Sequence, residues 1–116
     1  MSTYIEKPWG HELVWARTDR YVGKILHIKA GESLSLQYHR VKDETIMVLR
    51  GHLVLEHYRD GEPPSKTELG PQQPFHIPTG LRHRMIATEE TEVLEVSTPE
   101  LDDVVRLEDR YGRAGT

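Results

Sequence analysis

Apolar residues along the chain fall into short segments separated by Gly and Pro. Within residues 33–39, apolar and polar positions alternate, so the polar side chains share one face of a strand and the apolar side chains share the other. Residues 44–50 and 52–58 flank Gly51, and this arrangement predicts a β-hairpin. Further strands are expected at residues 21–29, 75–77, 84–88 and 92–97.

Many short strands with Gly and Pro turns predict an all-β barrel or sandwich of jelly-roll topology. Residues 99–113 are the expected exception, because Thr98 or Pro99 suits a helix start and Gly112 suits a helix end. We therefore predict a short C-terminal helix there. A chain of 116 residues suits one compact core, so residues 1–116 are expected to form a single domain.

Composition narrows the choice of partners and cofactors. Fifteen Lys and Arg against nineteen Asp and Glu leave a net charge of −4, which argues against a nucleic-acid partner. The chain has no Cys, so a metal must be bound by His, carboxylate or amide groups, and a reducing, cytoplasmic location is expected. Residues 1–10 lack a signal-peptide pattern, and no apolar run approaches the ~20 residues of a membrane helix, so no membrane association is expected.

Four residues form a candidate metal site. Gln37 and His39 are two positions apart and share one face of a strand, and Glu44 begins the next strand after a loop of four residues. His83 follows a Pro- and Gly-containing turn at residues 78–80. Two imidazoles, a carboxylate and an amide suit one divalent ion; zinc is the first expectation, with Mn, Fe, Ni or Co as alternatives. For Gln37, a weak donor, a hydrogen bond to a metal-bound water is the alternative role.

The spacing of these residues resembles the first motif of the cupin superfamily. That motif is Gly, five residues, His-x-His, three or four residues, Glu, six residues and Gly. Here the corresponding positions are Gly31, Gln37, His39, Glu44 and Gly51, with Gln in place of the first His. The resemblance implies a double-stranded β-helix barrel.

The second cupin motif is matched in part. It ends in Pro-x-Gly-x-x-His-x-x-x-Asn, and Pro78, Gly80 and His83 agree with it. Ala87 stands where the Asn should be, and seven residues instead of five separate Gly70 from Pro78. Matches of this number at fixed offsets are hard to obtain by chance.

Three segments narrow the resemblance to the cupin module of the bifunctional mannose-6-phosphate isomerase/mannose-1-phosphate guanylyltransferases. Residues 34–39 resemble their Leu-Ser-Leu-Gln-x-His stretch, residues 7–10 their Pro-Trp-Gly entry, and residues 103–113 their Asp-x-Val-Arg-x-Glu-Asp-x-Tyr-Gly-Arg ending. The resemblance covers nearly the whole chain. No Gly-rich nucleotide loop occurs in it, so guanylyltransferase activity is not expected from these residues.

The resemblance implies a metal-dependent sugar or sugar-phosphate isomerase of the mannose 6-phosphate type, in which Glu44 and His76 are the predicted catalytic residues. The base stays open among His76, an unliganded His83, a hydroxide on the metal, and a Glu beyond the ligands. Lys24 and Arg84 are predicted to bind a substrate phosphate, with an ordinary surface charge as the alternative for either.

Two other functions compete with the isomerase. Small cupins also resemble sugar-binding or regulatory modules, because a fold does not dictate a function. An iron-dependent dioxygenase is the weaker rival, since such sites generally resemble three His and one Glu. A homodimer is expected, because apolar residues on both strand faces around 46–55 would otherwise leave an exposed patch.

Overall fold

The computed structural model describes residues 2–115, and within them every regular element is a β-strand. In chain order the strands are β1 (Thr3–Lys7), β2 (Gly10–Arg17), β3 (Val22–Ile28), β4 (Leu36–Tyr38), β5 (Glu44–Arg50), β6 (Leu53–Tyr58), β7 (Ser65–Leu69), β8 (Pro74–Ile77), β9 (Arg82–Ala87), β10 (Thr91–Ser97) and β11 (Val105–Glu108). The all-β class expected from the sequence is confirmed. Within these residues no helix is long and apolar enough to cross a membrane.

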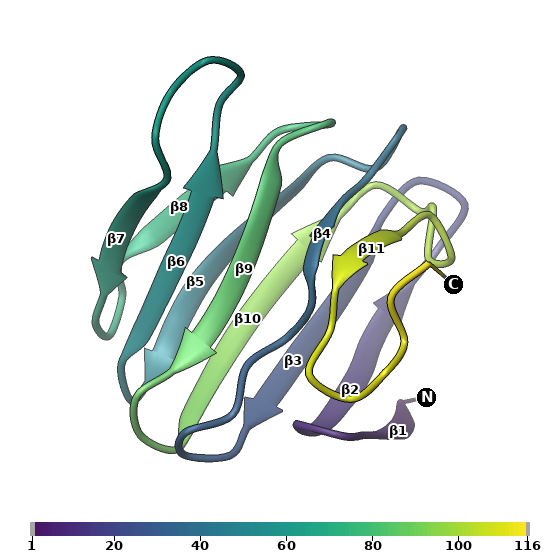
Figure 1. Ribbon diagram of the computed structural model, residues 1–116. Helices are drawn as coiled ribbons and strands as arrows, with labels where there is room; N and C mark the ends of the chain where they lie inside the picture. The colour runs from purple at the N-terminus through teal and green to yellow at the C-terminus, as the bar shows by residue number, and fades with distance from the viewer. Residues whose placement is uncertain (1, 116) are drawn as a thin grey trace.

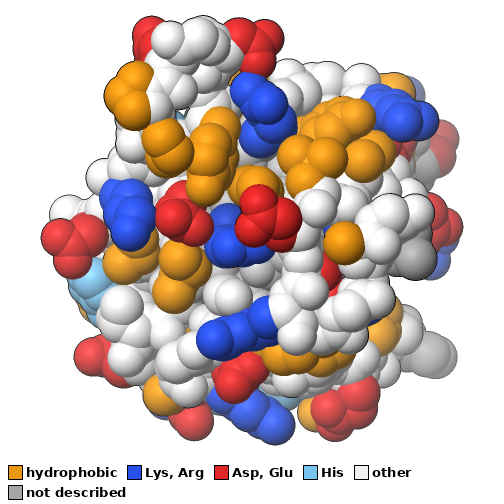
Figure 2. All heavy atoms as spheres, viewed as in Figure 1, with side chains coloured by type: hydrophobic (Ala, Val, Ile, Leu, Met, Phe, Trp, Pro, Cys, Tyr) orange, Lys and Arg blue, Asp and Glu red, His pale blue; other side chains and the backbone are white. Residues whose placement is uncertain are grey.

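The strands form two facing antiparallel sheets (Figure 1). The six-stranded sheet has the order β1-β2-β3-β10-β5-β8, and the five-stranded sheet has the order β11-β4-β9-β6-β7. Because consecutive strands alternate between the sheets along much of the chain, residues far apart in sequence meet in the interior. Figure 2 views the outer face of the five-stranded sheet, where charged side chains of both signs are interspersed with apolar ones.

The predicted C-terminal helix is wrong. Residues 105–108 form β11, which pairs antiparallel with β4 at Val105↔Tyr38 and Arg106↔Gln37. The neighbouring β-branched Val104 and Val105 favour extended backbone, and β4 supplies a hydrogen-bonding edge from a distant part of the chain. Thr98 and Pro99 therefore precede a turn region rather than a helix.

The predicted hairpin between residues 44–50 and 52–58 is also wrong. Strand β5 pairs with β8 and β10, whereas β6 pairs with β7 and β9 in the other sheet. The chain crosses between the sheets at Gly51, whose φ is +94°. A Cβ at this position would lie 2.5 Å from the backbone oxygen of Glu90, so the crossing requires glycine.

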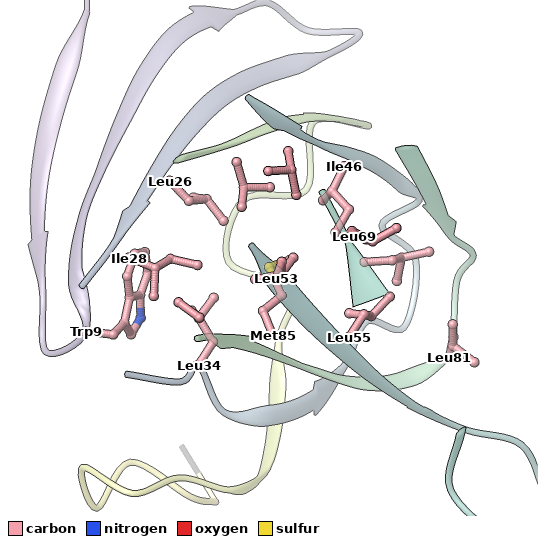
Figure 3. Packing of buried hydrophobic residues seen from close by; sticks show 14 residues of the cluster. Trp9, Leu26, Ile28, Leu34, Ile46, Leu53, Leu55, Leu69, Leu81 and Met85 are labelled. Carbon is pink, nitrogen blue, oxygen red and sulfur yellow. The ribbon is translucent and has the colours of Figure 1, made fainter. Parts of the chain in front are cut away.

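The hydrophobic core fills the space between the sheets (Figure 3). Its labelled members come from both sheets and from the connecting loops, and they are Trp9, Leu26, Ile28, Leu34, Ile46, Leu53, Leu55, Leu69, Leu81 and Met85. On β3, β5, β6 and β9, side chains of alternate residues enter this core. Burial of the inward-facing apolar surface is the main force that holds the sheets together.

The interior changes from apolar to polar at one level of the barrel. On successive inward positions, Val93 is followed by Glu95 on β10, and Met85 is preceded by His83 on β9. On β5, Ile46 is preceded by Glu44 in the same way. All of these side chains are buried, so the fold carries polar groups into its interior at one end.

Candidate metal centre

Three of the four predicted metal ligands meet at the polar end of the barrel. His39 follows β4, Glu44 is the first residue of β5, and His83 is the second residue of β9. Each offers one ligand atom, and these three atoms lie within 4.8 Å of one another. All three residues are buried. Ligand bonds of about 2.1 Å to a common ion would place such atoms about 3–4 Å apart, so the cluster has a suitable size.

Backbone carbonyls orient both imidazoles. Nδ1 of His39 lies 2.6 Å from the carbonyl oxygen of Asp103, and Nδ1 of His83 lies 2.9 Å from that of Leu81. A carbonyl oxygen only accepts hydrogen bonds, so Nδ1 carries the proton in each ring. In the neutral rings, Nε2 therefore presents a lone pair, as it does in metal-binding histidines held by an outer hydrogen bond.

Nε2 of His39 and Nε2 of His83 have no hydrogen-bond donor among the described residues, and Oε2 of Glu44 has the ammonium of Lys42 at 3.1 Å. All three atoms are buried. Nε2 of His39 lies 3.1 Å from Oε2 of Glu44, so two electron-rich atoms face each other unless a proton or a cation lies between them. Buried polar groups without partners are costly, and a shared divalent cation would satisfy all three at once. The donor set therefore fits a metal.

Gln37 lies beside this cluster. Its backbone pairs with that of His83 across β4 and β9, and its side chain lines the same cavity as His39 and Glu44. The carboxamide oxygen Oε1 accepts a 3.2 Å hydrogen bond from the hydroxyl of Ser35. The amide is thus held in the cavity wall next to the three ligand-type residues.

Sequence reasoning missed two buried charges next to the cluster. Nζ of Lys42 lies 3.1 Å from Oε2 of Glu44 and 3.1 Å from Oε2 of Glu95. All three residues are buried. Side chains alternate between the two faces along β10, so the sequence could have placed Glu95 on the inner face with Val93. Lys42 lies in a loop, and no local signal in the sequence shows that its side chain points inward.

Burial and neighbouring charges set the protonation of this group. Burial opposes ionisation of Glu44, but contact with His39 and the charge of Lys42 outweigh it and lower the pKa of Glu44. Burial also works against the charge of Lys42, yet Glu95 and Glu44 raise its pKa. Burial and the charge of Glu44 raise the pKa of Glu95. Burial lowers the pKa of His83, which keeps its ring neutral and available as a ligand.

Asp103 holds the loop between His39 and Glu44. Its carboxylate accepts hydrogen bonds from the backbone N–H groups of Arg40, Val41 and Lys42, at 3.1, 2.7 and 2.8 Å. These bonds, with that from Lys42 contributing most, lower the pKa of Asp103. Asp103 is the first residue of segment 103–113, whose residues match a known family pattern. That match is the signal in the sequence that could have identified Asp103 as a functional residue.

The cluster opens into a cavity of about 440 Å³. Its walls come from both sheets and include Trp9 and Leu34 from the core together with Glu95 and Lys42. Several cationic side chains also line it, and they are Lys7, Arg17, Lys24, Arg106 and Arg113. The cavity therefore combines buried carboxylates near the candidate metal ligands with a positively charged lining.

Three other residues predicted for the site, Lys24, His76 and Arg84, lie outside the cluster of candidate metal ligands. Lys24 lines the cavity, but its Nζ lies 3.3 Å from Oε1 of Glu12 in a buried ion pair. His76 is 58% exposed at its side chain, and its Nε2 lies 2.8 Å from Oδ1 of Asp43. Arg84 points to the outer face of β9, where its Nη2 lies 3.6 Å from Oε1 of Glu108. Alternation explains both placements, because Ile77 and His83 take the adjacent inward positions.

These placements give no support to the catalytic role predicted for His76 or the phosphate-binding role predicted for Arg84. Lys24 has the right location, although its charge is already balanced by Glu12. Single-sequence reasoning could not decide which of two adjacent residues faces inward on short strands.

The chain is similar to a protein family and to several curated proteins. A family profile described as "Cupin domain" matches residues 24–97. "Mannose-1-phosphate guanylyltransferase ManC" of Salmonella typhimurium strain LT2 is 35% identical over 97% of this chain and 24% of its own length. "Mannose-1-phosphate guanylyltransferase" of Escherichia coli strain K12 is 35% identical over 94% of this chain and 23% of its own length. The chain thus spans about a quarter of these relatives.

Solved structures with the same fold are more distant in sequence. KdgF from Halomonas sp. has a TM-score of 0.73 at 21% identity, covering 86% of this chain and 90% of that chain. CapF from Staphylococcus aureus has a TM-score of 0.77 at 18% identity, covering 93% of this chain and 33% of that chain. Oxalate decarboxylase from Bacillus subtilis has a TM-score of 0.78 at 14% identity, covering 91% of this chain and 30% of that chain. These likenesses establish the fold.

Proposed function

This chain belongs to the cupin family, and we propose that it is a metal-dependent isomerase that interconverts an aldose and a ketose. The observation that carries the proposal is a second buried carboxylate, Glu95, in the wall of the cavity that His39 and Glu44 also line. An isomerase of this kind needs a metal site and a separate base beside one substrate cavity. Mannose 6-phosphate and fructose 6-phosphate are the first pair to test.

His39, Glu44 and His83 would hold the metal, with Gln37 beside them and zinc as the expected ion. When bound there, the ion would act as a Lewis acid that polarises the sugar carbonyl and its neighbouring hydroxyl. A base must then move one proton between adjacent carbons. Of the bases considered from sequence, a Glu beyond the ligands fits the geometry better than the exposed His76.

Glu95 is that carboxylate. In the proposed reaction it removes the proton from C2 of the aldose and returns it to C1, while the hydroxyl proton on O2 moves to O1. No net atom or electron is gained or lost. Burial and the charge of Glu44 raise the pKa of Glu95, which makes its ionised carboxylate a stronger base. Lys42, 3.1 Å from Oε2 of Glu95, orients the carboxylate toward the site.

Cationic groups support a phosphorylated substrate. Arg106 lines the cavity and is the cross-strand neighbour of Gln37. Among the described residues, its guanidinium takes part in no hydrogen bond or ion pair, so its donors are available to an anion. A guanidinium fork matches the geometry of phosphate oxygens. Arg17 lines the same cavity and adds positive charge, whereas Nζ of Lys7 lies 4.0 Å from Oε1 of Glu12.

The relatives support a mannose phosphate as the substrate class. Their names describe enzymes that act on mannose 1-phosphate, and this chain matches about a quarter of their length. A carbohydrate-binding module without turnover is the second candidate. The contact between Lys42 and Glu44 favours it, because Lys42 already neutralises the only charged ligand.

The two candidates are separated by proton exchange at C2. The metal-loaded protein is incubated with mannose 6-phosphate in deuterated water, and NMR follows loss of the C2 proton and appearance of fructose 6-phosphate. Glu95→Gln should lower kcat about 10²- to 10⁴-fold, the usual contribution of a positioned base, while metal content is retained. Glu68→Gln, a matched change at a carboxylate that is 75% exposed on β7, should leave kcat unchanged.

Binding of the sugar without any exchange over hours would overturn the isomerase and favour the binding module. Unchanged kcat in Glu95→Gln would remove Glu95 as the base. Isothermal titration with the same sugar phosphate distinguishes lost binding from lost chemistry in each variant.

A further inference from the structure

A buried lysine contacts the only carboxylate among the candidate metal ligands. Nζ of Lys42 and Nε2 of His39 each lie 3.1 Å from Oε2 of Glu44. The side chains of Lys42 and Glu44 are only 6% and 2% exposed, so water screens this ion pair weakly. One carboxylate oxygen thus contacts both a fixed positive charge and a candidate metal ligand.

A divalent ion held by His39 and Glu44 would meet this ammonium at close range. Because Nζ of Lys42 is 3.1 Å from Oε2 of Glu44, a ligand bond of about 2.1 Å to that oxygen brings the ion within about 5 Å of Nζ. Positive charges this close repel each other, and burial reduces the screening between them. Both cations also need lone pairs of the same oxygen. Lys42 and the ion therefore compete for Glu44.

Glu95 offers the ammonium a second partner. Oε2 of Glu95 also lies 3.1 Å from Nζ of Lys42, and this carboxylate is buried as well. When an ion takes over Glu44, Lys42 therefore keeps one ion pair. Without Glu95, release from Glu44 would leave a buried ammonium with no carboxylate partner, which is strongly unfavourable. The second carboxylate thus makes an exchange of cations at Glu44 possible.

We propose that Lys42 neutralises Glu44 when no ion is bound, and that a divalent ion displaces it from Glu44 onto Glu95. Lys42 is then a positioning residue that lowers the metal affinity of the site and keeps its carboxylate paired in the metal-free protein. Structural zinc sites lack such a substitute cation, and small domains built on them unfold without the metal. This displacement rests on the metal site of the proposed function but requires no isomerase turnover.

The displacement has two consequences for the site. Loss of the ion returns Lys42 to Glu44, so the metal-free chain stays folded and can bind an ion again. Binding of the ion leaves Lys42 paired with Glu95 alone, which fixes the carboxylate proposed as the base. The ion and the base are therefore organised in the same step.

An outer support for the ligand is the alternative role of Lys42, and it has the opposite effect on metal affinity. Neighbouring hydrogen bonds often orient carboxylate ligands, and loss of such a bond weakens metal binding about 10- to 100-fold. A supporting donor suits the carboxylate oxygen that the metal leaves free. Lys42 instead contacts Oε2 of Glu44, the oxygen that also lies 3.1 Å from Nε2 of His39. This contact favours competition over support.

The zinc affinity of the full chain distinguishes competition from support. Competition with a fluorescent zinc chelator measures it in the wild type, in Lys42→Met and in Lys42→Leu, and the Leu variant excludes binding through a thioether. Both variants should bind zinc about 5- to 150-fold more tightly than the wild type, the usual range of coupling between two ligands. Lys24→Met is the matched control, because Lys24 is also buried and lines the same cavity but contacts Glu12. Its zinc affinity should stay close to that of the wild type.

A second background keeps the test valid if loss of the lysine alone unfolds the chain. In Glu95→Gln, one of the two buried carboxylates is already neutral. Lys42→Met/Glu95→Gln should therefore stay folded, as checked by circular dichroism, and should bind zinc more tightly than Glu95→Gln alone. Equal or weaker binding in the double variant would contradict the competition.

NMR of the lysine side-chain nitrogens provides a measurement on the wild type. Zinc should shift the Nζ signal of Lys42, because its ammonium changes partners, and should leave the Nζ signal of Lys24 in place. Unchanged or weaker zinc affinity in both Lys42 variants, or an unmoved Lys42 signal at saturating zinc, would overturn the displacement while leaving the metal site intact. A wild type that binds no zinc would remove the metal site and the displacement with it.

Discussion

The carbonyl oxygen of Asp103 accepts a 2.6 Å hydrogen bond from Nδ1 of His39, across 64 residues of sequence. The carboxylate of the same residue accepts three backbone N–H bonds from the loop that leads from His39 to Glu44. One residue near the C-terminus thus sets both the tautomer of a candidate ligand and the path of the loop to the next one. Outer hydrogen bonds of this kind orient metal ligands.

We expect one divalent ion per chain, bound through His39 and His83. His39→Ala or His83→Ala should abolish stoichiometric binding, because one imidazole and one carboxylate retain only modest affinity. His76→Ala is the matched control, since this exposed histidine pairs only with Asp43 among the described residues. Metal content after dialysis is measured by elemental mass spectrometry. Full occupancy in both ligand variants would disprove the site.

Asp103→Ala should weaken metal binding about 10- to 100-fold without removing a ligand, because the loop loses the carboxylate that holds it. Competition with a fluorescent zinc chelator measures the affinity. Asp103→Asn is the conservative comparison and should retain part of it through the amide oxygen. Equal affinity in all three proteins would show that the loop holds its shape unaided.

The same carboxylate should make stability depend on pH. Hydrogen bonds lower the pKa of Asp103 in the folded protein below its ordinary value of 3.8, so the unfolded chain binds a proton more readily. The resulting stabilisation is complete above that ordinary value and is lost as the pH falls through the lower folded pKa. Urea unfolding of the wild type and Asp103→Asn from pH 7 to pH 2 should show a stability difference that shrinks toward acid. A constant difference would contradict this origin.

Lys42→Met should destabilise the fold by about 3–5 kcal/mol, because it leaves Glu44 and Glu95 buried without their shared cation. The double variant Lys42→Met/Glu95→Gln should recover much of this loss, since one of the two carboxylates becomes neutral. Lys66→Met, at a side chain that is 65% exposed and lies 3.9 Å from Oε2 of Glu56, should change stability by less than about 1 kcal/mol. Urea unfolding free energies provide the comparison. Additive effects of the Lys42 and Glu95 changes would mean that the pair is not coupled.

Gln37→His should retain the metal and shift the preference toward iron or copper, because a third imidazole replaces an amide oxygen. Metal competition with equal mixtures of zinc, iron and copper, followed by elemental analysis, measures the shift. Ser35→Ala is the control, since it removes only the hydrogen bond to Oε1 of Gln37. An unchanged metal profile in Gln37→His would place that side chain outside the ligands.

Local patterns in the sequence predicted most of the strands between residues 21 and 97 and singled out Gln37, His39 and Glu44 as candidate ligands. The alternation at residues 33–39 and the spacing of Gln37, His39 and Glu44 depend only on the period of a strand and on a short loop, both of which are local properties. The Pro- and Gly-containing turn at residues 78–80 marked His83 as a further candidate, and the resemblance to the second cupin motif supported it. The structure has strands at these places and brings His39, Glu44 and His83 together, while the bound metal stays a prediction.

Tertiary structure decided which strands pair and which charges enter the interior. Gly51 suggested a hairpin, but hydrogen bonding to β8 and β10 draws β5 into the other sheet. Residues 105–108 formed a strand because β4 offered them an edge, a partner that no local window contains. Lys42, Glu95 and Asp103 acquired their positions through contacts across tens of residues. Local preference is weak compared with the free energy of packing and pairing, so long-range partners determine such features.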